Sequence, residues 1–336
     1  MVKKIALFFV KTILPIFLGI YLFWFFFDNM KEDEIDLFYL TMKEADYFWI
    51  ILSLVLGFAA FVSRAYRWKY LLEPMGYKSK SINRFHATMI GYLVNLTIPR
   101  AGEASRAAML YRSDGVPFTK SFGTIITERI IDLSILGSFT LFTLIWASND
   151  FYDIKNQMEM KFGSNNSNEI GWLGICFIVL LSFLIGLLIT NKKFRNRIIS
   201  VVKDLSSGVL SIFKTKKPIP FIAHTIFIWS CYVVMFMLPF YSLETTAELP
   251  VKCMFIGFIA GAIGMTFTNS GVGSYPILVG LVVAFYLNRD NNTDATAIGN
   301  ALGLLIWASQ TFVMAFLGLF SLVLLPKNYS KENKLS

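Results

Sequence analysis

The chain has 336 residues, of which 55% are hydrophobic and only 16% are charged. A soluble domain of this length has about 45–50% apolar and about 25% charged residues. This composition, with a mean hydropathy of +0.58, excludes an ordinary soluble domain and predicts an all-α, multi-pass membrane helix bundle. The net charge of +9 is spread over short loops beside apolar segments, which argues against nucleic-acid binding.

The N-terminal half begins with an apolar stretch that predicts a retained transmembrane helix over 5–27. It is longer than the apolar core of a signal peptide, which has about 7–15 residues. An acidic loop over 28–46 precedes a second predicted helix over 47–70. The next segment is apolar but interrupted, and we expect two short helices over 85–98 and 101–112.

Further helices are predicted over 121–148, 170–190 and 218–243, and the basic loop 191–217 precedes the last of these. A second interrupted segment follows, with predicted helices over 251–268 and 276–287. A final helix over 296–325 leads into a basic tail. The whole chain, residues 1–336, is expected to form a single transmembrane domain.

The charges of the loops predict the orientation, because Lys and Arg gather in loops that stay in the cytoplasm. Loop 191–217 holds eight Lys and Arg residues against one acid, Asp204, and both chain ends are basic. We therefore expect the N- and C-termini in the cytoplasm. The interrupted segment 85–112 then starts and ends inside, whereas 251–287 starts and ends outside. Each is either a re-entrant hairpin or a pair of short spans, and the two have inverted orientation.

Prolines and glycines mark both interruptions. The first contains Pro99 and Gly102, and the second contains Gly271, Gly273 and Pro276. Such residues oppose a continuous helix, and irregular backbone at membrane depth is tolerated only against protein or a wet cavity. Ordinary loops between short helices are the alternative interpretation. Asn95 and Asn269 border the interruptions, where we expect them to form interhelical hydrogen bonds.

Charged residues at regular spacing follow Pro99. Arg100, Glu103 and Arg106 are three residues apart, and share a face if the chain is helical from Gly102 onward. Guanidinium groups bind phosphate oxygens in pairs, so this group is a candidate site for a lipid headgroup. Arg112 follows at the end of the segment. Loop charge that sets the orientation is the alternative.

A second charged group lies within the predicted helix 121–148. Glu128 and Asp132 are one turn apart, with Arg129 between them. Ionisable residues inside a membrane helix are costly and usually face a bundle interior or a cavity. They are expected to complete the headgroup site by pairing with the arginines of the first interruption, to carry a proton, or to form a structural ion pair between helices.

Arg64 and Arg67, at the end of the second helix, are expected to anchor it at the interface or to attract anionic headgroups. Cys176, Cys231 and Cys253 fall in apolar segments without metal-ligand spacing, and no nucleotide-binding motif is present. We therefore expect no cofactor and no metal.

Four short motifs resemble the transmembrane domain of lysylphosphatidylglycerol synthase-type proteins. They are Arg64–Trp68 (RAYRW), Pro99–Arg106 (PRAGEASR), Glu128–Asp132 (ERIID) and Gly271–Gly273 (GVG). The chain departs from the family pattern after the last of these, where Ser274–Pro276 stand and many relatives carry a Glu. The resemblance implies a bundle in the bacterial cytoplasmic membrane that moves a polar or aminoacylated phospholipid between leaflets.

The expected partners are a phospholipid, the bilayer and, as a further candidate, a separately encoded lipid-modifying enzyme. Because the sequence ends soon after its last predicted helix, we expect no soluble aminoacyl-transfer domain and no synthesis of lysyl-lipid by this chain. Two alternatives remain open. One is an intramembrane transferase on a lipid-linked substrate, with Glu103 or Asp132 as base. The other is a non-catalytic membrane partner of a separate lipid synthase.

Overall fold

The computed structural model describes residues 32–150, 217–289 and 294–326, and four single residues outside these ranges. Every regular element within these ranges is helical. The helix predicted over 170–190 lies outside the described residues. The same holds for the helix predicted over 5–27 except for Tyr21 and Trp24, and for the loop 191–217 except for its last residue. The chain divides into two compact units, one of residues 1–126 and 215–336 and the other of residues 127–214.

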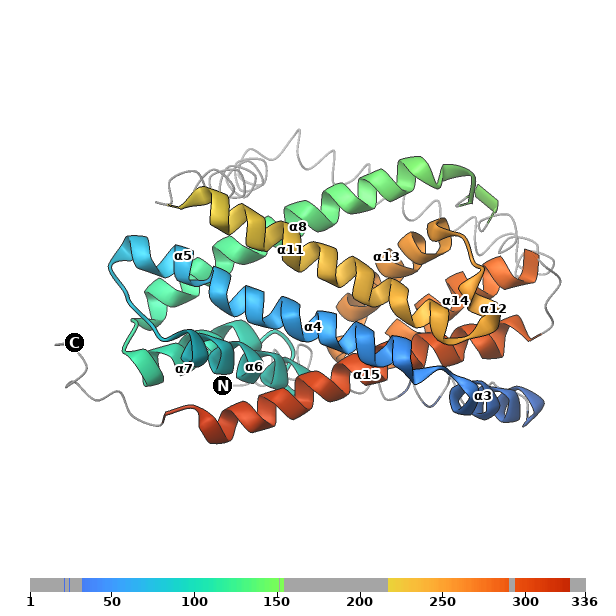
Figure 1. Cartoon of the computed structure of the whole chain (residues 1–336), viewed down its shortest axis with the longest axis horizontal. Coiled ribbons are helices and arrows are strands. Elements are labelled where there is room, and N and C mark those ends of the chain that lie inside the picture. Colours follow the sequence, from blue (N-terminus) through green and yellow to red (C-terminus); the bar gives the residue numbers. More distant parts are fainter. Residues whose placement is uncertain are drawn as a thin grey trace, which may run out of the picture. The chain divides into compact units, whose positions relative to one another are not determined.

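Within each of the two halves, α3 to α8 and α11 to α15, the described helices follow one another with short connections (Figure 1). In the first half they are α3 (Glu32–Glu44), α4 (Tyr47–Arg67), α5 (Lys69–Leu72), the short 3₁₀ helix η2 (Glu73–Met75), α6 (Ser81–Thr97), α7 (Gly102–Asp114) and α8 (Phe118–Trp146). In the second half they are α11 (Pro218–Met237), η4 (Leu238–Ser242), α12 (Glu244–Ala247), α13 (Val251–Phe267), η5 (Asn269–Gly271), α14 (Ser274–Arg289) and α15 (Ala295–Leu324).

Four helical stretches of the described chain are long and apolar enough to cross a membrane. They are Tyr47–Met75, Phe118–Trp146, Pro218–Ser242 and Ala295–Leu324. Large apolar side chains on them are exposed, including Val323 and Ile219, each at 79%. An exposed apolar surface of this extent is stable in contact with lipid rather than water. The predicted all-α, multi-pass membrane fold is confirmed.

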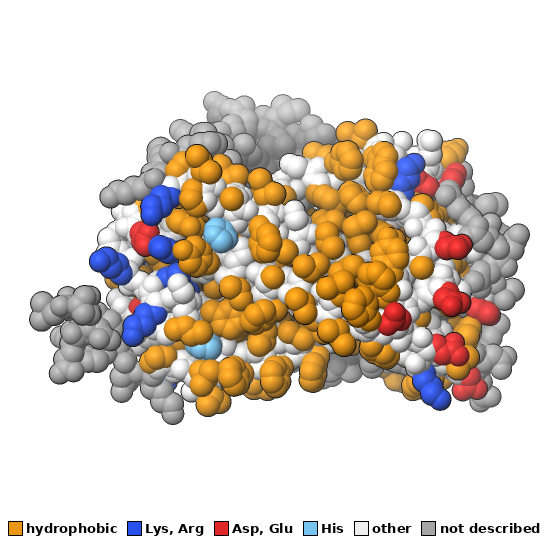
Figure 2. All heavy atoms as spheres, in the orientation of Figure 1, with side chains coloured by type: hydrophobic (Ala, Val, Ile, Leu, Met, Phe, Trp, Pro, Cys, Tyr) orange, Lys and Arg blue, Asp and Glu red, His pale blue; other side chains and the backbone are white. Residues whose placement is uncertain are grey.

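Charged side chains are separated along the first unit. In Figure 2, Lys and Arg gather at the end where α5 lies, and Asp and Glu gather at the end of α3 and α12, with a broad apolar surface between them. Helix α4 follows the same polarity, because Asp46 caps its start by accepting a hydrogen bond from the Phe48 amide at 2.9 Å. Its last turn carries Arg64 and Arg67.

Helices α4 and α11 run antiparallel and pack against each other. At one end the Asp46 amide donates to the Ser242 carbonyl at 2.8 Å. At the other end the Arg67 guanidinium donates to the Thr225 hydroxyl at 2.9 Å. These two hydrogen bonds fix the register of the pair from end to end.

Helices α6 and α7 form an antiparallel helical hairpin, called here the first hairpin (Figure 1). Its open end is joined by the Lys80 amide, which donates to the Asp114 carboxylate at 3.0 Å. Near its tip the two backbones touch at Gly91 and Gly102. A Cβ atom on Gly102 would overlap the Gly91 carbonyl oxygen and would lie 2.5 Å from Cγ of Asn95. Only glycine permits this approach.

Helices α13 and α14 form the second hairpin, which is also antiparallel. A Cβ atom on Gly264 would lie 2.8 Å from the Cα atom of Tyr275. The Ser274 hydroxyl donates to the Gly264 carbonyl at 2.7 Å, so the start of α14 is tied to the last turns of α13. Close backbone packing through small residues is the usual way in which helices associate in membranes.

Helix α15 packs against both hairpins, which approach it from opposite ends. Along its C-terminal half lies α6, with His86 and Ser321 sharing a hydrogen bond of 2.9 Å. Along its N-terminal half lies α14, and a Cβ atom on Gly303 would lie 3.1 Å from Cα of Pro276. The first hairpin therefore opens toward the C-terminal end of α15, and the second opens toward its N-terminal end.

Candidate functional site

The tip of the first hairpin is an irregular stretch over residues 98–101. Ile98 is extended, and Arg100 has a φ of 63°, a left-handed conformation that non-glycine residues seldom adopt. Pro99 has no backbone N–H, so the Asn95 carbonyl lacks the donor that a continuing helix would supply. Helix α7 then starts at Gly102, whose amide donates to the Asn95 side-chain oxygen at 2.7 Å.

The tip of the second hairpin spans residues 268–273 and is also left-handed in places. Ser270, Gly271 and Gly273 have φ values of 54°, 76° and 72°. The Thr268 hydroxyl donates to the Val272 carbonyl at 2.9 Å and lies 2.7 Å from the Ser274 hydroxyl. Neutral side chains therefore hold this irregular backbone together.

The two tips are joined directly. The Asn269 side-chain amide donates to the Leu96 carbonyl at 2.7 Å, and the Ser270 hydroxyl donates to the Asn95 carbonyl at 3.0 Å. Both carbonyls belong to the last turn of α6, where no further helical amide is present to bond them. The second tip therefore caps the helix that Pro99 ends, and the interhelical hydrogen bonds predicted for Asn95 and Asn269 are confirmed.

The junction lies near the middle of α15. The Trp307 indole N–H donates to the Ser270 carbonyl at 2.9 Å. Trp307 is 12 positions after Ala295 and 17 before Leu324, about 18 Å and about 26 Å from the helix ends at 1.5 Å per residue. Both interruptions are thus far from either end of a helix that is long enough to span a bilayer.

Arg106 is the buried cation of α7 in the first hairpin. Its side chain is 4% exposed, and its Cζ atom lies 3.8 Å from the centroid of the Trp68 ring. Guanidinium groups stack on aromatic faces at this distance. Trp68 is itself fully buried and donates to the Thr124 hydroxyl at 2.7 Å. The stack holds the charge of α7 against the end of α4.

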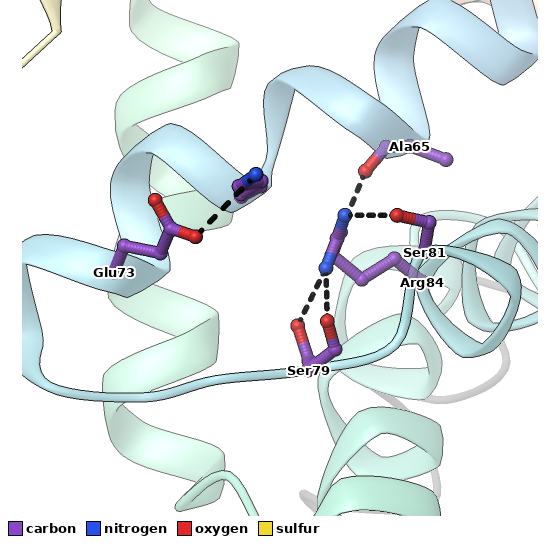
Figure 3. Close-up of polar contacts among 6 residues, drawn as sticks. Ala65, Glu73, Ser79, Ser81 and Arg84 are labelled. Atoms are coloured by element: carbon purple, nitrogen blue, oxygen red, sulfur yellow. Dashed lines mark hydrogen bonds and ion pairs between the residues drawn. The ribbon is translucent and has the colours of Figure 1, made fainter.

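Arg84 connects the start of α6 to α4 and to the loop between them. It donates to the Ala65 carbonyl at 3.0 Å and to the hydroxyls of Ser79 and Ser81 at 2.9 and 2.8 Å (Figure 3). Burial lowers the pKa of the Arg84 guanidinium, while Asp114 acts in the opposite direction. The hydrogen bonds of Arg84 tie the start of α6 to α4 and to residues 79–81.

Arg64 and Arg67 are buried inside the protein, at 3% and 0% exposure. The Cζ atom of Arg67 lies 5.1 Å from the Phe221 ring centroid, and that of Arg64 lies 5.9 Å from the Tyr232 ring. Both side chains pack against α11 in the described contacts. Their predicted role as interfacial anchors or as attractors of anionic headgroups stays a prediction.

The other predicted site residues differ in how exposed they are and in which of the two compact units they belong to. Arg100 and Arg112 are exposed and Glu103 is half-buried. Arg100 precedes α7, so the spacing of three places only Glu103 and Arg106 on one helical face. Glu128 and Asp132 are buried at 0% and 7% and Arg129 is half-buried, and all three belong to the unit of residues 127–214.

Several important residues carried little signal in the sequence. Arg84 belongs to none of the charged groups considered in the sequence, and Ser270 is only part of an interrupted segment. Nothing in the sequence distinguished Trp307 from any other apolar residue of its helix. Trp68 follows Arg67 in the sequence, but its stacking with Arg106 depends on a contact between two helices. No local sequence pattern indicates that contact.

Comparison with known proteins places these hairpins in a family context. The family model described as "Lysylphosphatidylglycerol synthase TM region" matches residues 12–284, which include the first hairpin and most of the second. A UPF0104 membrane protein of Methanocaldococcus jannaschii is 31% identical over 99 residues, which cover 29% of this chain and 30% of that protein. The match thus spans less than a third of the relative's length. No solved structure matches the chain.

Proposed function

Because the chain belongs to the lysylphosphatidylglycerol synthase transmembrane-region family, we propose that it moves a polar or aminoacylated phospholipid between the leaflets of a membrane. The observation that carries this proposal is the junction of two oppositely directed helical hairpins at the middle of α15. In transporters, broken helices in inverted halves surround the substrate site near the midplane of the bilayer.

We propose that both hairpins are re-entrant. Helices α6 and α13 have 17 residues each, about 25 Å at 1.5 Å per residue, which is less than the roughly 30 Å of the hydrocarbon core. Their tips would meet inside the bilayer, where the freed backbone groups bond to the other tip. Relative movement of the hairpins would then open a polar path from either side, within a single transmembrane domain.

The proposed headgroup site centres on Arg106, with Glu103 on the same face of α7. A buried guanidinium inside a membrane protein is costly and is usually functional. Glu128, Arg129 and Asp132, which belong to the unit of residues 127–214, are also proposed to bind the headgroup, as is Arg100 at the first tip. Secondary roles are proposed for Arg64, Arg67, Arg112 and Asn95.

The orientation is also a proposal. The basic end of the first unit, which contains α5, would face the cytoplasm. We propose that both chain termini lie in the cytoplasm and that the membrane is the cytoplasmic membrane. If the lipid is aminoacylated, the enzyme that makes it would be a separately encoded partner.

A leaflet-exchange assay tests the proposal. The protein is reconstituted into liposomes with fluorescently labelled phosphatidylglycerol, lysyl-phosphatidylglycerol or phosphatidylethanolamine, and dithionite bleaches the label in the outer leaflet. We expect full bleaching in protein-containing vesicles for at least one of these lipids. Exchange no faster than in protein-free vesicles for all three would overturn the proposal.

Substitution of Arg106 links the activity to the site. We expect Arg106→Gln to slow exchange about tenfold or more, because losing a buried charge contact costs at least about 2 kcal/mol. Lys120→Gln removes an exposed charge at the start of α8 and is the control, with an expected change below about twofold. Size-exclusion profiles and circular dichroism would verify that both variants are folded. Equal rates for the two variants would remove Arg106 from the site.

A further inference from the structure

An apolar groove runs along the α4 and α11 pair, and the ring of Phe58 in its lining lies 5.8 Å from the Phe85 ring of α6. It has a volume of about 850 Å³, with Val55, Phe58 and Val62 on one side and Ala223 and Phe227 on the other. Val55 and Phe58 are 56% and 44% exposed. Both helices lie within spans long enough to cross a membrane, so the groove would be open to the lipid chains.

The length of the groove fits one leaflet. Its lining on α4 runs from Val55 to Tyr66, which is 11 positions or about 16 Å at 1.5 Å per residue. Half of the roughly 30 Å hydrocarbon core is about 15 Å. An acyl chain that lay in the groove would therefore extend over the depth that one leaflet provides.

One end of the groove is polar and aromatic. Ser63 and His224 share a hydrogen bond of 2.7 Å across the two helices. The His224 ring lies 5.2 Å from the Tyr66 ring and 5.9 Å from the Tyr70 ring. Aromatic rings with one polar group favour the boundary between hydrocarbon and headgroups. This end is therefore at the depth where the polar part of a lipid begins.

Basic side chains lie just beyond the aromatic end. Tyr70 lines an adjoining cavity of about 270 Å³ together with Glu73, Lys78 and Lys217. A second cavity of about 210 Å³ shares Glu73 and Lys78 with the first and adds Lys69. The Lys69 ammonium lies 5.4 Å from the Tyr66 ring centroid and 3.6 Å from the Glu73 carboxylate. Three ammonium groups against one carboxylate leave a net positive site.

We propose that this surface binds an anionic phospholipid of the bilayer, with one acyl chain in the α4–α11 groove and its phosphate at Lys69, Lys78 and Lys217. The apolar groove, the aromatic boundary and the basic cavities follow one another in the order in which a phospholipid presents its chain, backbone and phosphate. Lysine ammonium groups near a membrane surface attract anionic headgroups. This site is separate from the lipid path proposed above and does not depend on it.

Photocrosslinking of the full chain in phosphatidylcholine nanodiscs tests the proposal. A small fraction of phosphatidylglycerol with a diazirine on its acyl chain is included, and crosslinked peptides are mapped by mass spectrometry. We expect crosslinks within 55–66 and 223–227. The yield should exceed that of the matching phosphatidylcholine probe about fivefold or more, because each basic residue favours the anionic lipid. Equal yields with both probes would overturn the assignment of an anionic lipid.

Two variants separate the groove from the basic cavities. Ala223→Trp fills the groove and is expected to reduce the yield about fivefold or more, whereas Ile226→Trp on the exposed side of α11 leaves it unchanged. A Lys78→Gln, Lys217→Gln double variant should keep the chain crosslinks but lose the preference for phosphatidylglycerol. If Ala223→Trp crosslinks as well as Ile226→Trp, no chain occupies the groove and the proposal fails. These readouts measure binding, so they do not change if leaflet exchange is absent.

Discussion

The two hairpins share one architecture but differ in their chemistry. Each begins with a helix of 17 residues, turns at a tip with a left-handed non-glycine residue, and returns beside its first helix. The return helices differ sharply. Helix α7 carries Glu103, Arg106 and Arg112, whereas the only charged residue of α14 is Arg289 at its end.

This difference shows that a helix interruption does not require charge. At the second tip the hydroxyls of Thr268 and Ser274 and the neighbouring carbonyls stabilise the broken backbone. At the first tip the freed groups bond to the neutral side chains of Asn95, Asn269 and Ser270. Neutral hydrogen-bonding groups thus stabilise both breaks in the described contacts, whereas the charged side chains of the two return helices lie in α7 and at the end of α14.

The largest loss of stability is expected from Gly102→Ala, which tests the close helix packing that the two hairpins share. The added Cβ atom would overlap the Gly91 carbonyl oxygen, which is backbone and cannot move aside. We expect the free energy of unfolding to fall by about 3 kcal/mol, at the upper end for overpacking. The measurement is the thermal midpoint of the detergent-solubilised protein.

Two matched glycines sharpen this result. Gly264→Ala in the second hairpin meets the Tyr275 backbone and should destabilise in the same direction, whereas a Cβ atom on Gly123 has no neighbour within 4 Å. We expect Gly123→Ala to be neutral or to stabilise by up to about 1 kcal/mol. If Gly102→Ala melts at the same temperature as Gly123→Ala, the close crossing in the first hairpin is incorrect.

A smaller effect is expected from Asn269→Ala, which cuts the link between the tips. It leaves the Leu96 carbonyl without the donor that now lies at 2.7 Å, and we expect a loss of about 1–3 kcal/mol in the free energy of unfolding. Hydrogen exchange of amides in the last turn of α6 should also become faster, while that of α13 changes little.

The control for Asn269→Ala is Thr266→Ala in the same hairpin. The Thr266 hydroxyl is exposed and bonds only to carbonyls of its own helix in the described contacts. Its removal should change stability by less than about 0.5 kcal/mol. An Asn269→Ala variant as stable as Thr266→Ala would mean that the tips are not held together by this bond.

Much of the fold could be predicted from the sequence, because long apolar runs specify membrane helices and prolines with glycines specify interruptions. Loop charges then indicated that the two interrupted segments run in opposite directions. The meeting of the two tips could not be predicted. The bond from Asn269 to Leu96 joins residues 173 positions apart, and no local pattern in either segment indicates its partner.

The candidate site was less predictable for a physical reason. Arg100 and Arg106 are the same residue type in one short motif, yet one is exposed and the other is buried against Trp68. The difference arises because Arg100 precedes the first turn of α7 in a left-handed conformation. Arg84 was overlooked because three of its partners are the carbonyl of Ala65 and the hydroxyls of two serines, which carry no charge pattern.

The smallest loss of stability is expected from Trp307→Phe. This substitution tests whether α15, like the first hairpin, stabilises the second tip through a hydrogen bond. The substitution keeps an aromatic ring but removes the N–H that donates to the Ser270 carbonyl. We expect a loss of about 1 kcal/mol in the free energy of unfolding, the usual net contribution of one hydrogen bond. Trp146→Phe, at an indole that is 42% exposed, should change the thermal midpoint less. A loss above about 3 kcal/mol in the free energy of unfolding would mean that Trp307 acts mainly through packing. The tips would then be joined chiefly by the hydrogen bonds of Asn269 and Ser270.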